Sequence, residues 1–274
     1  MTSRELLGSA TAELEQAGCP SPRVDAEWLL AHALRMTRSE LYADGDHPLS
    51  AADQERFGEL VARRARREPL AYVLGEWGFR RLTLRVDSRV LVPRPETESV
   101  VERCLELLAG SVEPRVLDVG VGSGAIALAI ADEHPGARVS GIDVSGDALA
   151  LARENAVQTG LDIELLERDV FQGLPEGPWE LVVSNPPYVD PGDRATLQPE
   201  VRDWEPDTAL FGRDVTATVA AAAVDVLIDG GALVLEVGDG QAQATAALLA
   251  SLGYAEVRTT PDLAGRDRVV EGRR

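Results

Sequence analysis

Residues 185–188, Asn-Pro-Pro-Tyr, stand directly after the short apolar run "LVVS". Two consecutive prolines cannot continue a β-sheet, because neither has an N–H group to donate. The side-chain oxygen of Asn185 and the carbonyl of Pro186 can each accept one hydrogen of a planar NH2 group, and Tyr188 can pack on its plane. The motif therefore forms a candidate substrate site, with Asn185, Pro186 and Tyr188 as catalytic candidates and Pro187 as a further contact.

Such a site suits a conjugated nitrogen, either that of an amide or that of a nucleobase amine. This nitrogen is a poor nucleophile because its lone pair is delocalised. Two acceptors that hold its hydrogens also aim the lone pair at an incoming group. No strong base is needed, since the N–H group acidifies as the new bond forms. Positioning then supplies most of the rate, as expected for two substrates in a preorganised site.

A glycine-rich turn lies upstream in "VLDVGVGSGAIALAI", residues 116–130, between an apparent strand and a helix. Glycines permit a tight turn and let backbone N–H groups approach a ligand. Asp143 ends the next apolar run, 19 residues after Gly124, where an acid can accept from both hydroxyls of a ribose. The spacing is GxGxG, as in S-adenosylmethionine (SAM) enzymes, and not the GxGxxG of dinucleotide folds. The predicted cofactor contacts in this turn are Gly120, Val121, Gly122, Ser123 and Gly124.

Further acids suit the same cofactor. Asp118 precedes the turn and could face the sulfonium or the amino group of SAM. Asp169 suits the exocyclic amine of adenine, with Val170 beside the ring, and Asn185 stands close to the methyl donor. The cofactor is therefore predicted to be SAM, leaving as S-adenosylhomocysteine. The alternative is a turn without a nucleoside, in which Asp143 only caps a helix.

Short apolar runs alternate with helical ones from residue 115 onward. This alternation predicts an α/β fold with a mostly parallel sheet covered on both faces. Ligands of such sheets lie beyond the carboxyl ends of the strands, which places Asn185 at the edge of the site. The longest stretch without a pattern, residues 189–212, directly follows the motif, and loops of that length are usually functional or mobile.

Residues 1–75 carry helical periodicity in three stretches and predict a small helical bundle. Ser21 and Ser50 are candidate N-caps, and Pro22 suits a first helical turn. The arginines at positions 63, 64, 66 and 67 could form a binding patch, but a solvated helix face is the preferred interpretation. Residues 76–92 alternate around a turn at Asp87-Ser88 and predict a linking hairpin. The predicted division is thus 1–75, 76–92 and 93–274.

Composition excludes several classes of protein. The net charge of −19 argues against a protein that grips a bare phosphate backbone. Cys19 and Cys104 are too few and too far apart for a disulfide framework. The histidines, at positions 32, 47 and 134, lack metal-ligand spacing, so no metal is expected. With no apparent signal peptide or membrane span, we expect a cytoplasmic monomer that binds neither membrane nor nucleic acid.

The assembled motifs resemble those of the bacterial peptide-chain release factor glutamine methyltransferases over nearly the whole chain. The matching segments are "VLVPRPETE" (90–98), "VLDVGVGSGAIALAI" (116–130), "VVSNPPYV" (182–189), "EVRDWEPDTALFG" (200–212), "GGALVLEVGDGQ" (230–241) and "DLAGRDRVV" (262–270). The Asn-Pro-Pro-Tyr motif also occurs in adenine-N6 methyltransferases, whereas "PRPETE" and "DLAGRDRVV" are far more specific.

The resemblance implies a class I SAM-dependent methyltransferase fold, Rossmann-like with a seven-stranded sheet, and a reaction. A methyl group passes from SAM to the side-chain amide of the Gln in the Gly-Gly-Gln loop of class I release factors, which modulates translation termination. The family's SAM contacts carry over onto Gly120–Gly124, Asp143, Val170 and Asn185, and its glutamine contacts onto Asn185–Tyr188. The N-terminal helical domain is implied to help dock the release factor.

The sequence departs from the family pattern in two places. Relatives often hold an aromatic residue at position 170, so Val170 would offer adenine a weaker face. "FGRDVT", residues 211–216, stands where relatives show a Gly-Gly and an Asp-Gly pair. In "PRPETE", Glu96 or Thr97 is expected to start a helix; whether Arg94 and Glu96 also line the glutamine pocket stays open between two equal interpretations.

Two other functions compete with protein methylation. A nucleic-acid adenine-N6 or cytosine-N4 amino methyltransferase would need stacking side chains and a basic channel for a flipped base. The acidic balance and an aromatic content of 4% count against it. A SAM-binding protein without catalysis is the other candidate, and the intact Asn-Pro-Pro-Tyr motif counts against that.

Overall fold

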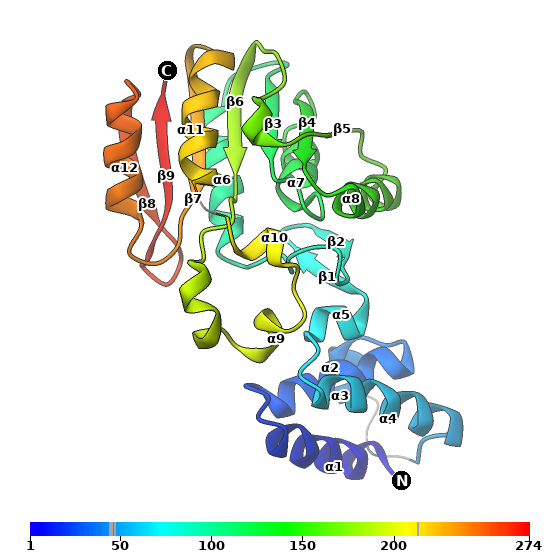
Figure 1. Ribbon diagram of the computed structural model, residues 1–274. Helices are drawn as coiled ribbons and strands as arrows, with labels where there is room; N and C mark the ends of the chain where they lie inside the picture. The colour runs from blue at the N-terminus through cyan, green and yellow to red at the C-terminus, as the bar shows by residue number, and fades with distance from the viewer. Residues whose placement is uncertain (44–45, 47, 213) are drawn as a thin grey trace. The chain divides into compact units, whose positions relative to one another are not determined.

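The computed structural model describes residues 1–43, 46, 48–212 and 214–274 (Figure 1). His47 and Arg213, which the sequence analysis considered, lie outside the described residues. The chain divides into two compact units. The first comprises Met1–Gly75 together with Leu197–Trp204, and the second comprises Glu76–Thr196 and Glu205–Arg274. The first unit is therefore not continuous in sequence.

The first unit is helical, as its periodicity predicts. Thr2 caps the first helix in a capping box with Glu5, and the Ser50 hydroxyl accepts from the Asp53 backbone N–H at the start of another. Ser21 stands at an N-cap position, but the prediction that its side chain caps was wrong, because it makes no capping hydrogen bond. The described helices of this unit are α1 (Ser3–Gln16), α2 (Pro22–Leu34), α3 (Arg38–Ala43), α4 (Ala51–Ala65), α5 (Leu70–Leu74) and α9 (Pro199–Arg202).

The arginine run at the end of α4 is exposed only at Arg66, which corrects the preferred interpretation of the whole run as a solvated face. Arg64 is buried, and its guanidinium lies 2.8 Å from both Asp25 Oδ2 and Glu200 Oε1. Arg67 forms two further hydrogen bonds with Glu200. Buried charges occur in proteins when they are paired, and the partners here lie far away in sequence, which local periodicity does not show.

The hairpin consists of β1 (Glu76–Phe79) and β2 (Leu82–Arg85) and belongs to the second unit. Its turn is at Arg80 and Arg81, so the prediction that Asp87-Ser88 forms the hairpin turn was wrong. Arg80 adopts a φ of 50°, and its guanidinium forms hydrogen bonds with Glu102 and Glu133, which supports that backbone. Asp87 instead accepts from the Arg89 backbone N–H and guanidinium in a separate turn.

A seven-stranded sheet forms the centre of the second unit, with the order β5-β4-β3-β6-β7-β9-β8. Only β9 runs against the others among the described strands, since it pairs antiparallel with both β7 and β8. The predicted mostly parallel α/β fold is confirmed. The strands are β3 (Arg115–Val119), β4 (Arg138–Asp143), β5 (Glu164–Glu167), β6 (Trp179–Ser184), β7 (Leu227–Glu236), β8 (Ala255–Pro261) and β9 (Asp267–Arg273).

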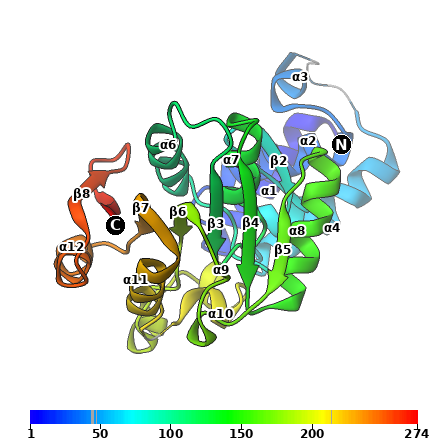
Figure 2. The same cartoon turned by 90° about the horizontal axis from the view of Figure 1, so that it is seen from above.

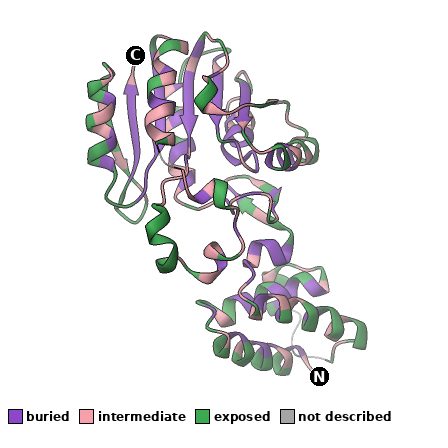
Figure 3. Cartoon of the chain, in the orientation of Figure 1, coloured by how far each residue is buried: buried purple, intermediate pink, exposed green. Residues whose placement is uncertain are grey.

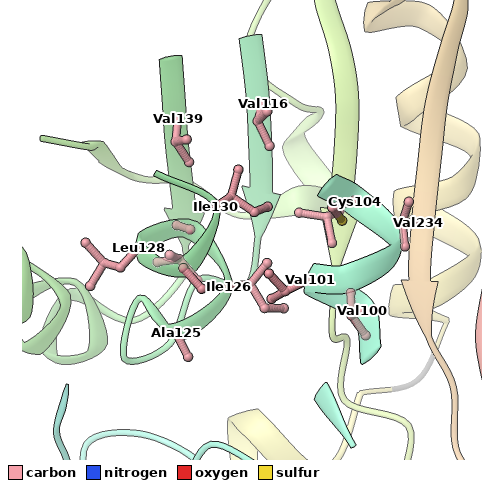
Figure 4. Packing of buried hydrophobic residues seen from close by; sticks show 14 of the residues in the cluster. Val100, Val101, Cys104, Val116, Ala125, Ile126, Leu128, Ile130, Val139 and Val234 are labelled. Carbon is pink, nitrogen blue, oxygen red and sulfur yellow. The ribbon is translucent and has the colours of Figure 1, made fainter. Parts of the chain in front are cut away.

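Helices cover both faces of this sheet (Figure 2). The helices α6 (Thr97–Leu107), α7 (Ala125–Glu133) and α8 (Gly146–Thr159) pack on one face, and α11 (Val215–Val226) and α12 (Ala242–Ser251) pack on the other. The strands inside the sheet are largely buried, the edge strands β5 and β8 are mostly exposed, and the helices turn exposed residues outward (Figure 3). Val101, Cys104, Ile126 and Ile130 pack between α6, α7 and the strands (Figure 4). Burial on both faces explains the continuous apolar runs of the strands.

The stretch 189–212, which has no pattern in the sequence, contains three short helices. They are η2 (Pro191–Thr196), α9 and α10 (Asp207–Leu210). The Val189 N–H donates to the Leu210 carbonyl at 3.0 Å, so the two ends of the stretch meet. In the part of the chain that the structure describes, no helix is long and apolar enough to cross a membrane.

Candidate active site

The glycine turn joins the end of β3 to the start of α7. Gly120, Gly122 and Gly124 all have positive φ values, of 78°, 53° and 85°, which side chains other than glycine rarely adopt. The Gly120 and Val121 N–H groups donate to the Ile142 carbonyl at 2.8 and 2.9 Å. The neighbouring strand β4 thus fixes the turn on which a ligand would rest.

Asp143 is the last residue of β4 and organises the same loop. Its Oδ2 accepts from the Gly122 N–H and its Oδ1 from the Ser145 N–H, each at 2.9 Å. Burial raises the pKa of this carboxyl, although these hydrogen bonds counteract the shift. A carboxylate oxygen offers two lone pairs, so each oxygen can still accept from a ligand hydroxyl.

A cavity of about 200 Å³ opens at the carboxyl ends of β3, β4 and β6. It collects most of the site residues predicted from the sequence. The predicted residues on its wall are Gly120, Val121, Gly122, Ser123, Asp143, Asp169, Val170, Asn185, Pro186 and Pro187. The structure therefore brings the glycine turn, the acid that follows it and the Asn-Pro-Pro motif to one place.

Two predicted site residues lie outside this wall within the described chain. Gly124 stands behind the turn, where an added Cβ would meet Leu128 Cδ1 at 3.0 Å, so this glycine allows close packing of α7. Tyr188 is half-buried beside Gly238, whose added Cβ would lie 2.9 Å from Tyr188 Cδ2. Burial, together with the nearby Glu236, raises the pKa of Tyr188 to about 12.

Asn185 directly follows β6, and its side chain is held from behind. Its Nδ2 donates to the Thr97 hydroxyl at 3.3 Å, which leaves Oδ1 as the free acceptor of the amide. Thr97 is the first residue of α6, its hydroxyl contacts Glu236 and Asn185, and Glu96 at the N-cap makes no capping hydrogen bond. "PRPETE" therefore contributes Thr97 to the support of Asn185, a role that the sequence analysis missed.

Asp118 does not face the cavity, which corrects the suggestion that it meets the sulfonium or amino group of SAM. It alternates with Leu117 and Val119 along β3 and points toward α7, where Oδ2 accepts from the Ala127 N–H at 3.1 Å. Oδ1 has no hydrogen-bond partner among the described residues. Burial raises the pKa of Asp118 to about 7.

The wall also contains Phe171, which was not predicted from the sequence, and Arg94, for which the sequence left two interpretations open. Phe171 follows Val170 and exposes an aromatic ring at the wall. Arg94 lies on the wall, and its guanidinium pairs with buried Glu205 at 2.6 Å, whereas Glu96 is not among the wall residues described. The structure therefore supports the interpretation that Arg94 lines the pocket, and it gives no such support for Glu96. The sequence around Glu205 does not predict its pairing with Arg94, because the two residues lie far apart in the chain.

Comparisons with known proteins agree with this architecture. A family model for the PrmC N-terminal domain matches residues 5–75, and one for the methyltransferase small domain matches residues 100–200. Among solved structures, the chain resembles a 16S rRNA N2 G1207 methyltransferase of T. thermophilus, with a TM-score of 0.54 at 19% identity. The match covers 73% of this chain and 49% of that one, and it supports the methyltransferase fold alone.

Two curated relatives match over nearly their whole length. The release factor glutamine methyltransferase of Deinococcus radiodurans is 47% identical, with 100% of this chain and 99% of the relative covered. The protein of the same name from Geobacter sulfurreducens is 41% identical, with 99% and 96% covered. Identity of this extent across both units means that this chain belongs to the release factor glutamine methyltransferase family.

Proposed function

We propose that this protein transfers a methyl group from SAM to the side-chain amide nitrogen of a glutamine, that of the Gly-Gly-Gln loop of class I peptide-chain release factors. The observation that carries the proposal is the position of Asn185. Its amide oxygen is left free by the hydrogen bond to Thr97, on the wall of a cavity that also contains the glycine turn and Asp143. Amide acceptor and cofactor loop thus share one site.

The residues present fit SAM. Asp143 keeps lone pairs for two ribose hydroxyls, and the glycine turn lacks the side chains that would fill the cradle. Asp169 lines the cavity and accepts from the Phe171 N–H, and its carboxylate can also accept from an exocyclic amine. Val170 and Phe171 offer apolar surface to a ring. Phe171 can supply the aromatic face that Val170 lacks. Bound there, SAM supplies an electrophilic methyl group, and S-adenosylhomocysteine leaves.

Asn185 and Pro186 act on the substrate amide. Their oxygens accept the two N–H hydrogens and turn the nitrogen lone pair toward the methyl group. The N–H group becomes acidic as the new bond forms, so the proton can pass to solvent without a strong base. Gly212 and Gly238 let the chain approach Pro187 and Tyr188 closely, since an added Cβ would lie 2.3 and 2.9 Å from them. Close packing keeps these acceptors in place.

Docking of the release factor is assigned to the first unit. Val24 and Trp28 stand one helical turn apart on α2 and are both exposed, as is Tyr42 at the end of α3. Arg38 lies over the Trp28 ring, 5.5 Å from its centroid. Exposed aromatic and arginine side chains of this kind are typical centres of protein interfaces. A Gly-Gly-Gln loop alone offers few contacts, so a larger docked surface is needed.

Nucleic-acid methylation is not the preferred function. The full-length relatives reported above carry the name of release factor glutamine methyltransferases, whereas the likeness to an rRNA enzyme concerns the fold. We also expect a cytoplasmic monomer, in which the buried thiols of Cys19 and Cys104 stay reduced.

The test is methyl transfer from labelled SAM. The protein is incubated with an intact class I release factor, with a factor in which the glutamine of the Gly-Gly-Gln loop is alanine, and with single-stranded DNA and RNA. We expect label only in the intact factor, on the glutamine side chain by mass spectrometry. Label in nucleic acid, or in the alanine factor, would contradict the proposal.

A further inference from the structure

A buried polar cluster, consisting of Thr97, Glu236 and Arg268, lies behind Asn185. Thr97 begins α6, Glu236 ends β7 and Arg268 lies in β9. The three side chains come from the segments "PRPETE", "GGALVLEVGDGQ" and "DLAGRDRVV", for which the proposed chemistry gives no direct role. Glu236 is completely buried, and Thr97 and Arg268 are 4% and 6% exposed.

Strand pairing brings Glu236 to Asn185. Ser184 pairs with Leu235 across β6 and β7, so the next residue of each strand, Asn185 and Glu236, stands at the same carboxyl edge of the sheet. The Thr97 hydroxyl bridges them, at 2.6 Å from Glu236 Oε2 and 3.3 Å from Asn185 Nδ2.

The direction of these hydrogen bonds follows from the groups themselves. An ionised carboxylate can only accept, so the single hydroxyl hydrogen of Thr97 is donated to Glu236. The Thr97 oxygen can then only accept, and its partner must be the NH2 side of the Asn185 amide. The amide is therefore held with Oδ1 directed away from Thr97. If the Asn185 amide were reversed, its NH2 group would face the NH2 group of the substrate glutamine and could not accept a hydrogen bond from it.

We propose that Glu236, acting through Thr97, is a positioning residue that fixes the direction of the Asn185 side-chain amide for methyl transfer. The inference rests on the proposed function. Arg268 supports the arrangement, since its Nη1 donates to the Val237 carbonyl at 2.9 Å and its positive charge acts on the Glu236 carboxylate.

The cost of the cluster argues that it does more than hold the fold. Glu236 Oε1 is buried without a hydrogen-bond partner among the described residues, and such a group destabilises a fold. Burial raises the pKa of Glu236 to about 7, even though the Thr97 hydroxyl, the charge of Arg268 and the Asn185 side chain favour the ionised form. Glu96 also faces the carboxyl and raises this pKa, and Tyr188 is close by. Buried polar groups without a hydrogen-bond partner are unfavourable for folding, and such exceptions occur mainly at functional sites.

The test compares Thr97→Val, Thr97→Ser and Glu236→Gln with the wild type on an intact release factor and labelled SAM. Valine keeps the shape of Thr97 and removes the bridge. We expect Thr97→Val to lower kcat roughly tenfold or more, short of the hundred- to thousand-fold loss of a direct group. The KM for the release factor and the affinity for SAM should stay near wild type, and Thr97→Ser should restore kcat.

The Glu236→Gln variant adds a pH readout. Protonated Glu236 can donate to Thr97, whose hydroxyl then donates to Asn185 Oδ1 and reverses the amide. The kcat of the wild type should therefore fall as pH falls through about 7, whereas that of Glu236→Gln should be independent of pH in this range, because a glutamine side chain does not titrate. Thr245→Val, at a threonine of α12 that is also buried, is the control for loss of a buried hydroxyl and should leave kcat unchanged.

The outcomes separate this inference from the proposed function. If the wild type does not label the factor, the proposed function fails. If it does and Thr97→Val keeps the wild-type kcat, the function stands and the positioning role is refuted. Equal loss of kcat in Thr97→Val and Thr97→Ser would also refute the role, since only packing would then matter. A Glu236→Gln variant with wild-type kcat and pH profile would refute it without reference to Thr97.

Discussion

Arg67 and Glu200 form a bidentate ion pair, with Nε and Nη2 at 2.7 and 2.5 Å from the two carboxylate oxygens. The pair holds the segment Leu197–Trp204 within the helical unit, although this segment follows the Asn-Pro-Pro-Tyr motif in the chain. Burial alone would raise the pKa of Glu200. The hydrogen bonds from Arg67 and Arg64 outweigh burial, so the pKa of Glu200 lies below its ordinary value. Deleting residues 1–75 would therefore leave Glu200 without these partners.

Replacement of Glu200 should destabilise the protein. Glu200→Ala takes away one of the two carboxylates that pair with the buried guanidinium of Arg64 and leaves it with Asp25 and the Glu68 carbonyl. Breaking a buried pair costs about 3 kcal/mol or more. Urea unfolding at pH 7 measures the loss. Glu113→Ala removes an exposed pair with Arg138 and should cost less than about 1 kcal/mol. Equal stability of the two variants would mean that Glu200 is not structural.

Loss of the Asn185 side chain should stop transfer without preventing cofactor binding. Removing a preorganised hydrogen-bonding group typically costs about a hundred- to a thousand-fold in rate. Single-turnover labelling of the release factor by Asn185→Ala measures this loss, and calorimetry on the same variant should show only a modest change in SAM affinity. Near-wild-type turnover would remove Asn185 from the mechanism.

Asp143→Ala should act on the cofactor. Hydrogen bonds to a charged carboxylate contribute roughly 1.5–3 kcal/mol each, so losing those to two ribose hydroxyls should weaken SAM binding at least about tenfold. The variant also removes the acceptor of the Gly122 N–H, which adds to the loss. Asp147→Ala, at an exposed acid in the first turn of α8, is the control. Unchanged affinity in the Asp143 variant would mean that this residue only organises the loop.

Trp28→Ala should impair docking. Aromatic centres of interfaces are typically worth about 2 kcal/mol, which corresponds to roughly thirtyfold in affinity. The KM for an intact release factor should rise by about that factor, while kcat/KM for a short Gly-Gly-Gln peptide should not change. Val157→Ala, at an exposed apolar residue of α8, serves as the control. Equal kinetics of wild type and Trp28→Ala on the intact factor would exclude docking through this side chain.

Asp118 should make the protein less stable as pH rises. Its pKa is about 7 in the folded state and near 4 when unfolded, so the folded form binds the proton more tightly. Stability is then greatest at low pH and is lost as pH rises through 7, by about 1.4 kcal/mol between pH 6 and 8.

Asp118→Asn should reduce the change in the free energy of unfolding between pH 6 and pH 8 by about 1.4 kcal/mol. Urea unfolding of wild type and variant at pH 6 and pH 8 tests it, and identical differences between the two pH values would show that Asp118 does not titrate there. Glu236→Gln is a necessary comparison, because burial raises the pKa of Glu236 to about 7 as well.

The sequence determined the features that depend on neighbouring residues. Alternating apolar runs predicted the strands and helices of the sheet, and the glycine turn, Asp143 and Asn185 were located because each stands at the end of a strand. These predictions succeed because backbone conformation, turn geometry and side-chain periodicity are local properties. The family was identified correctly from motifs of this kind.

Tertiary structure decided what happens between residues far apart in the chain. It buried Arg64, a member of the arginine run, in ion pairs with Asp25 and Glu200, and it directed Asp118 toward α7 and away from the cavity. It also placed Thr97 between Asn185 and Glu236. Such contacts depend on strand register and on helix packing, which bring together side chains that lie far apart in the sequence. The local sequence around one residue therefore does not predict its partner.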